Sequence, residues 1–271
     1  MNSFIRSILL VSVCVFIFGC ANNHYNIPRD EYAKRVKVLG VTPIFVDADS
    51  DIRHPEKAAV IALVKDYNRL NEKFLVDMIK KNGSHFDVRF LAGDEDPLFA
   101  SLLFRREKRD DAEIVYNKYF YKADALRDYI KSNRVDAVMV TVISGITRPD
   151  KVYSGNLMDY LATDYNFLIM TSQILDADGT ILWEYPNFRQ KHVSLSPFVA
   201  LQYPDFNEAE ANVSPTVDVK FKTVTGIKNT LDKREKDIFR RNKQVSEAYY
   251  SIFDDMASLL EPESGLFEGS K

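Results

Sequence analysis

The position of the cysteines limits how this chain of 271 residues can hold a fold together. Its two cysteines, Cys14 and Cys20, both lie within the first 20 residues. The rest of the chain can therefore build neither a disulfide, a cysteine-based zinc cluster nor a catalytic thiol. A fold without such cross-links must draw its stability from a large apolar core. With 46% hydrophobic and 28% charged residues, the composition is that of an ordinary globular protein.

The first 20 residues have the layout of an export signal. Arg6 is the one charge ahead of the apolar run 8–18, and Gly19 and Cys20 follow that run directly. The run has about 11 residues, whereas a helix needs roughly 20 to span a bilayer. We therefore expect residues 1–19 to be a cleaved signal peptide and not a permanent transmembrane helix.

The stretch Ile17-Phe18-Gly19-Cys20 resembles the lipobox of bacterial lipoprotein signal peptides. Ile17, Gly19 and Cys20 fit that pattern, whereas Phe18 is bulkier than the usual residue at its position. The resemblance implies cleavage before Cys20, covalent lipid on that cysteine, and membrane lipid as a partner. Each buried methylene contributes about 0.8 kcal/mol, so two or three acyl chains anchor stably. An ordinary secretory signal that ends in cysteine is the alternative.

Two further expectations concern the anchor. By the sorting rules of the lipoprotein family, Ala21 in place of Asp after the lipidated cysteine implies the outer membrane, with the protein facing the periplasm. Residues 20–35 are polar and contain Pro28, so we expect them to be a lipidated tether that keeps the folded body off the membrane.

Hydrophobic periodicity in the body predicts alternating strands and helices. The run 137–143 (AVMVTVI) is almost wholly apolar, which predicts a central strand buried on both faces. A stripe of apolar residues at spacings of three and four between Ile61 and Ile79 predicts a long helix that ends at Asn82-Gly83. Further strands are predicted at 36–43, 86–91, 165–175 and 180–185, and further helices at 97–109, 112–121 and 123–132.

This order predicts an α/β fold: a mixed sheet with flanking helices in a two- to three-layer sandwich, closed by a long C-terminal helix. We expect a single domain over 36–271, with insertions near 94–122 and 192–229. Heptad spacing of apolar residues places the C-terminal helix at about 230–260, where it packs one seam on the body.

Three stretches of the body carry a likeness to known proteins. They are 36–43, 134–146 (RVDAVMVTVISGI) and 167–185 (FLIMTSQILDADGTILWEY). In order and pattern they resemble a group of envelope lipoproteins that includes CsgG, LpoB and the N-terminal domain of TolB. The likeness covers roughly 36–190, with 246–260 matching a closing helix. It implies a binding or assembly role with an envelope protein as partner. The two insertions depart from the group, and no strand pair long enough for a secretion pore is evident.

An acidic loop follows the first predicted strand. Asp47, Asp49 and Asp51 have the D-x-D-x-D spacing that opens a calcium loop. An EF-hand needs Gly at its sixth position and Glu at its twelfth, and here Ile52 and Ala58 stand there. The sequence therefore excludes an EF-hand. If calcium binds, these three aspartates would be its main ligands. A solvated acidic loop is the alternative.

A second acidic cluster, Asp94-Glu95-Asp96, follows the second predicted strand. Ligands of α/β folds tend to bind beyond the carboxyl ends of strands, so the two clusters could share a site. A lipid-anchored hydrolase that uses these loop carboxylates, with or without a divalent cation, is thus one hypothesis. The sequence holds no G-x-S-x-G or H-E-x-x-H motif and no Gly-rich phosphate loop. We expect no cofactor other than the lipid.

The other hypothesis is a non-catalytic interaction or assembly factor of the cell envelope, with an unidentified envelope protein as partner. Tyr116, Tyr119, Tyr249 and Tyr250 lie at such close spacing that, if both segments are helices, some must face outward. An exposed aromatic patch marks a protein–protein contact. The net charge of −3 offers no basic field, so nucleic acid is not expected as a partner.

Overall fold

The computed structural model describes residues 24–111, 114–153, 160–187, 197–203, 219–236 and 242–261. The predicted signal peptide, Cys20 and Ala21 lie outside the described residues. So do residues 192–196 and 204–218 of the predicted second insertion.

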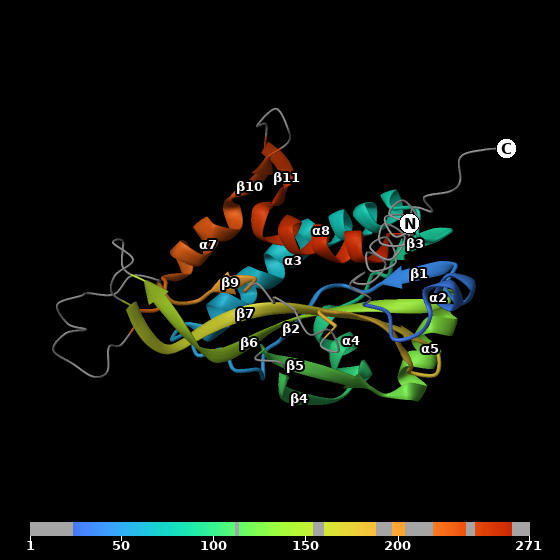
Figure 1. Cartoon of the computed structure of the whole chain (residues 1–271), viewed down its shortest axis with the longest axis horizontal. Coiled ribbons are helices and arrows are strands. Elements are labelled where there is room, and N and C mark those ends of the chain that lie inside the picture. Colours follow the sequence, from blue (N-terminus) through green and yellow to red (C-terminus); the bar gives the residue numbers. More distant parts are fainter. Residues whose placement is uncertain are drawn as a thin grey trace, which may run out of the picture.

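A mixed sheet forms the centre of the molecule (Figure 1). Its strands are ordered β3-β1-β6-β7-β8, with β2 paired to β6 and β9 paired to β7. Strand β1 runs parallel to β3 and β6, whereas β6, β7 and β8 are antiparallel. The bounds are β1 Val38–Val41, β2 Phe45–Asp47, β3 Asp87–Phe90, β6 Ala137–Tyr153, β7 Tyr160–Asp176, β8 Ile181–Tyr185 and β9 Val199–Ala200.

Helices cover both faces of this sheet, which confirms the predicted α/β fold class. One face packs against α3 (Lys57–Lys81), α7 (Val224–Asp232) and α8 (Glu247–Leu260). The other packs against α4 (Glu95–Leu102), α5 (Ala123–Asn133) and a hairpin of β4 (Leu103–Asp111) and β5 (Ile114–Tyr121). A short helix, α2 (Arg29–Arg35), precedes β1.

Strand β6 shows why the run 137–143 is apolar throughout. Met139 and Ile143 point into the core under α3 and α8, whereas Val138, Val140 and Val142 point into the core under α4 and α5. All five side chains are at most 1% exposed. The prediction of a strand buried on both faces is therefore confirmed, and the strand continues to Tyr153.

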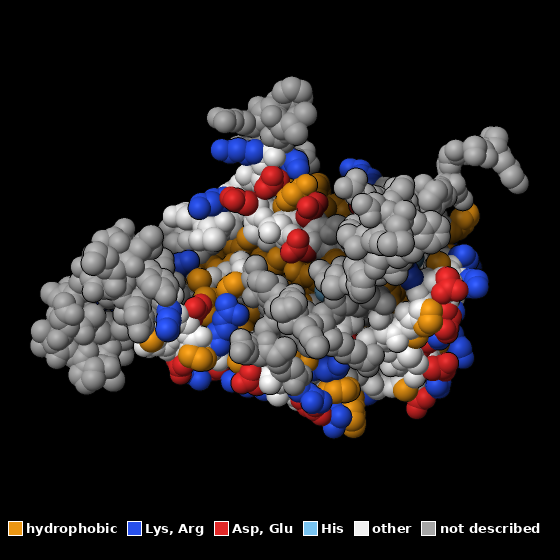
Figure 2. All heavy atoms as spheres, viewed as in Figure 1, with side chains coloured by type: hydrophobic (Ala, Val, Ile, Leu, Met, Phe, Trp, Pro, Cys, Tyr) orange, Lys and Arg blue, Asp and Glu red, His pale blue; other side chains and the backbone are white. Residues whose placement is uncertain are grey.

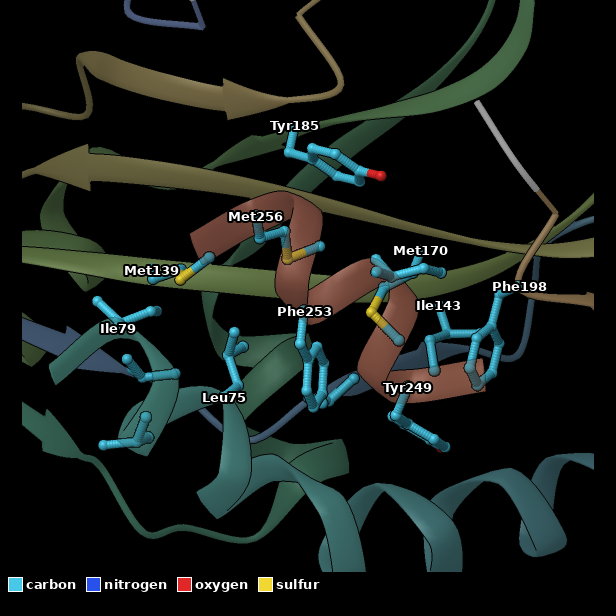
Figure 3. Packing of buried hydrophobic residues seen from close by; sticks show 14 of the residues in the cluster. Leu75, Ile79, Met139, Ile143, Met170, Tyr185, Phe198, Tyr249, Phe253 and Met256 are labelled. Carbon is cyan, nitrogen blue, oxygen red and sulfur yellow. The ribbon is translucent and has the colours of Figure 1, made fainter. Parts of the chain in front are cut away.

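The face covered by α3 and α8 holds the larger core. Figure 3 shows Leu75 and Ile79 of α3 and Phe253 and Met256 of α8 packed over the sheet residues Met139, Ile143 and Met170. Helix α3 ends as predicted, because Gly83 takes a positive φ of 72° directly after the cap residue Asn82.

The helices predicted at 97–109 and 112–121 are mostly wrong. A helix occupies only 95–102, and β4 and β5 then form an antiparallel hairpin in which Glu107 lies opposite Lys118 and Arg106 opposite Tyr119. Arg, Lys and Glu are good helix formers in isolation, which is why the local pattern is misleading. Burial of Tyr119 against the sheet, at 1% exposed, outweighs that local preference.

The C-terminal helix is present but begins at Glu247 and not near residue 230. Residues 234–236 and 242–246 instead form a small antiparallel sheet of β10 (Arg234–Lys236) and β11 (Asn242–Ser246) between α7 and α8. The heptad-spaced residues Leu231, Val245 and Ile252 are all buried, although they belong to three different elements. A seven-residue spacing can thus arise from separate segments that reach one core.

Residues 24–35 are not a free tether. Tyr25 forms a bridge with Trp183, the Asn26 N–H donates to the Leu182 carbonyl, and the Glu184 N–H donates to the His24 carbonyl. Tyr25 is 7% exposed and Tyr32, in α2, is 2% exposed. The prediction is wrong from residue 24 onward, because the aromatic side chains of this segment enter the core.

Candidate functional site

A groove lies between the second half of α3 and the outer side of α8. It has a volume of about 460 Å³. The apolar part of its lining is Phe74 and Met78 from α3 with Tyr250 and Ala257 from α8. Phe74 and Met78 belong to the apolar stripe of α3, but they lie beyond the part of the stripe that α8 covers. They are therefore only partly buried. The sequence pattern identifies these residues as core and does not reveal the groove.

Charged side chains of both signs border this groove. Lys81 and Lys243 supply the basic groups, and Asp254 and Glu261 supply the acidic ones. The Lys243 ammonium lies 3.9 Å from the centre of the Tyr250 ring, and such a contact holds an aromatic side chain in place. A lining that combines apolar side chains with charges of both signs suits an apolar or aromatic side chain of another protein. Figure 2 likewise shows acidic and basic side chains interspersed over the face in view.

The four tyrosines predicted to form an exposed patch have different environments. Only Tyr250 lines the groove, at intermediate exposure. Tyr116, Tyr119 and Tyr249 are 3%, 1% and 0% exposed, so their prediction as partner-binding residues is wrong. Tyr249 faces inward, where its hydroxyl donates to Asn68 Oδ1 at 2.6 Å. Tyr116 and Tyr119 lie on β5, which packs against the sheet.

The aspartates of the first acidic loop do not converge. The Oδ2 atom of Asp47 is 2.6 Å from Arg106 Nη1 and accepts a hydrogen bond from the Tyr119 hydroxyl at 2.8 Å. Asp51 pairs with Arg53 at 2.8 Å, and Asp49 is exposed. Among the described residues, no three His, Cys, Asp or Glu side chains gather as ligands for a metal ion. Asp47 therefore fastens the β4–β5 hairpin to the end of β2, which does not fit the predicted calcium site.

The second acidic cluster lies at the start of α4, where it forms ion pairs with α3. Asp96 Oδ1 lies 2.6 Å from Lys65 Nζ, and Glu95 Oε1 lies 2.8 Å from Arg69 Nε. Glu95 is 8% exposed, and its other oxygen, Oε2, has no hydrogen-bond partner among the described residues. The groove contains no residue of either acidic loop.

The sequence pattern does not reveal a buried carboxyl group that lies close to Glu95. Glu72, on α3, is 7% exposed and accepts a 3.4 Å hydrogen bond from the Ile44 N–H. Burial raises its pKa to about 7, and the negative charge of Glu95 pushes the pKa in the same direction. The sequence places Glu72 on the inner side of an amphipathic helix, and that position was the one available signal.

A buried ion pair also joins β5 to the edge of the sheet. Lys118 Nζ lies 3.2 Å from Glu184 Oε2, and Glu184 is 5% exposed. The other oxygen of Glu184 accepts a hydrogen bond from Asn26 at 3.3 Å. This carboxylate therefore links the N-terminal segment, β8 and the hairpin.

Within the described part of the chain, no helix combines the length and the hydrophobicity needed to cross a membrane.

Comparison with known proteins adds little. No family model matches the chain, and no curated protein matches it. Among solved structures, a neuraminyllactose-binding hemagglutinin homolog from Helicobacter pylori is similar, with 7% identity, 89% of each chain covered and a TM-score of 0.34. A likeness at that TM-score carries no argument, so the function has to be inferred from the chain's own residues.

Proposed function

We propose that this chain is a lipoprotein of the cell envelope, anchored in the outer membrane through lipid on Cys20 and facing the periplasm. We further propose that it acts as a non-catalytic interaction or assembly factor. The groove between α3 and α8 is its surface for a protein partner. The observation that supports this role is a groove lined by the apolar side chains of Phe74, Met78 and Tyr250 together with charges of both signs.

The ion pairs of the carboxylates considered for a hydrolase indicate a structural role for these groups. Asp47, Glu95 and Asp96 each pair with a cation, and each pair joins two elements of the fold. Asp47 and Glu95 are buried, so removal of the cation that pairs with either one would leave a buried charge without compensation, and these two groups contribute to stability. The interaction role is therefore better supported than hydrolysis.

The anchor is tested by metabolic labelling with radioactive palmitate. The full chain should incorporate label in bacteria, and the Cys20→Ala variant should not. A Cys14→Ala variant serves as the matched control, because Cys14 lies within the predicted signal peptide and should not affect labelling. Equal labelling of wild type and Cys20→Ala would contradict lipidation at Cys20.

The groove is tested by photo-crosslinking in intact cells. A photoreactive phenylalanine analogue at Phe74 should yield a discrete crosslinked product. The same analogue at Leu70 is the matched control, since Leu70 lies one turn earlier on α3, is 67% exposed and does not line the groove. The product at Phe74 should also disappear when Tyr250→Glu places a charge on the groove floor. Identical products from Phe74 and Leu70 would count against the groove.

A further inference from the structure

The two edges of the central sheet differ in whether another segment of the chain lies along them. At the β8 edge, residues 24–26 lie alongside the strand, with a bridge between Tyr25 and Trp183 and backbone hydrogen bonds on either side of it. At the opposite edge, β3 is the last strand, and no other described strand pairs with its outer side (Figure 1). An unpaired edge presents a row of backbone donors and acceptors to any strand that can approach.

The register of β3 shows which of its backbone groups are free. The N–H groups of Asp87 and Leu91 donate to carbonyls of Lys37 and Val41, beside or within β1. Because backbone groups alternate in direction along a strand, the N–H and C=O groups of Val88 and Phe90 in β3 point away from β1. These two residues therefore carry the hydrogen-bonding groups of the open edge.

The side chains along this edge are those of an interface. Phe86, directly before β3, is 89% exposed, and Val88 and Phe90 within β3 both contact the core under α3. Asp87 and Arg89 lie on the opposite face, where their side chains form a 2.7 Å ion pair. The strand has no Pro, Lys or bulge, which are the usual features that keep an open edge from pairing.

We propose that β3 pairs with β3 of a second copy of this chain, antiparallel and centred on Val88, so that two sheets become one. The sequence is self-complementary in this register. Val88 lies opposite Val88, and Phe86 lies opposite Phe90 of the second copy. Asp87 lies opposite Arg89, so the two-fold axis generates two such ion pairs.

The backbone agrees with this register. In an antiparallel ladder, directly opposed residues whose backbone groups face each other exchange both hydrogen bonds. Val88 and Phe90 have outward-facing groups. The register opposes Val88 to Val88 of the second copy, and Phe90 to Phe86, which directly precedes β3. Asp87 and Arg89 then fall at non-hydrogen-bonded positions, where opposed side chains are closest. The contact is short, so we expect a reversible dimer of the kind formed by small interfaces.

The test uses complementary charge variants of the full-length chain, analysed by native mass spectrometry from detergent solution. Wild type should form dimers with increasing concentration. Asp87→Arg and Arg89→Asp should each raise the dissociation constant about tenfold or more, because each places like charges opposite one another. A mixture of the two variants should form heterodimers in preference to either homodimer. Each variant has lost the ion pair between residues 87 and 89 of its own strand. Preferred heterodimers in the mixture would therefore report the ion pairs between the two copies.

Two matched controls exclude general effects of charge and hydrophobicity. Asp51 and Arg53 form the same kind of pair two residues apart, at 2.8 Å, on a loop away from β3. Asp51→Arg and Arg53→Asp should leave dimerisation unchanged. Phe86→Ser should weaken the dimer, whereas Phe104→Ser, at a residue that is 66% exposed on the hairpin, should not. A wild-type chain that stays monomeric up to about millimolar concentration, or a mixture without preferred heterodimers, would overturn the proposal.

Discussion

The hydroxyl of Tyr32 lies 2.7 Å from Nε2 of His85, and this contact joins α2 to the segment that follows α3. The other ring nitrogen of His85, Nδ1, is buried without a hydrogen-bond partner among the described residues. Burial lowers the pKa of His85 to about 4, because a charged imidazolium would lose its hydration there. The N-terminal segment is thus held to the body by a histidine that stays neutral.

Acid should weaken the fold through His85. Its folded pKa of about 4 lies below the ordinary value of 6.5, so the unfolded chain binds this proton more tightly. The stabilisation is complete above pH 6.5 and is lost as the pH falls toward 4, by roughly 2–3 kcal/mol. Urea unfolding of His85→Gln should lose this part of the pH dependence. Tyr32→Phe, which keeps the histidine, should retain it, and an unchanged pH slope in His85→Gln would refute the assignment.

Glu72 should make stability depend on pH in the direction opposite to His85. Its folded pKa of about 7 lies above the ordinary 4.5, so the native state binds this proton more tightly than the unfolded chain. Stability should therefore fall as the pH rises from 4.5 through 7, by about 3 kcal/mol. Glu72→Gln should be more stable than wild type at pH 8 and less sensitive to pH, whereas Glu56→Gln, at an exposed position, should match wild type. Equal unfolding curves for Glu72→Gln and wild type at pH 8 would contradict the prediction.

The effects of His85 and Glu72 should oppose each other between about pH 4.5 and 6.5. Wild-type stability should change little across that interval. Each single variant should then reveal the slope that the other residue causes, and the double variant should again be nearly flat. Unfolding curves of all four proteins at three pH values check this pattern.

Loss of the Tyr25 side chain should release residues 24–26 from the sheet. Tyr25 is 7% exposed and packs with its ring centre 4.8 Å from that of Tyr32, so Tyr25→Ala should cost about 3 kcal/mol of stability. Trp183, the one tryptophan, is fully buried beside this segment, and its fluorescence emission should shift to longer wavelength. Tyr203→Ala, at a residue that is 37% exposed, should leave the emission in place. An unshifted emission in Tyr25→Ala would show that the segment does not shield the indole.

Gly145 should tolerate no side chain. A Cβ atom there would lie 2.5 Å from the backbone oxygen of Asp51, and a backbone neighbour cannot move aside like a side chain. Gly145→Ala should therefore destabilise the protein by about 1–3 kcal/mol. Gly93→Ala should change stability by less than about 0.5 kcal/mol, since its nearest neighbour is the end of the Leu98 side chain at 3.3 Å. Thermal unfolding of both variants decides the point, and similar melting temperatures would contradict it.

Long periodic segments explain how much of the fold is predictable. The strand from Ala137 and the helix to Lys81 each carry many residues in one pattern, and both are found as expected. The β4–β5 hairpin was missed because its alternation is masked by charged residues that also suit a helix. The ion pair of Asp47 with Arg106 joins residues 59 positions apart, so no local sequence pattern predicts it. Likewise, the groove exists because α8 covers only part of α3, and that is decided by packing.

The strand-like segment at residues 24–26 has a consequence for how copies of the chain can associate. An exposed β8 edge together with the exposed β3 edge would allow head-to-tail addition of one molecule to the next, which leads to open fibres. Because residues 24–26 lie along β8, that edge of the described central sheet is not open to a second molecule. If β3 pairs with β3 as proposed, the docked segment prevents further addition at β8 and limits this association to pairs.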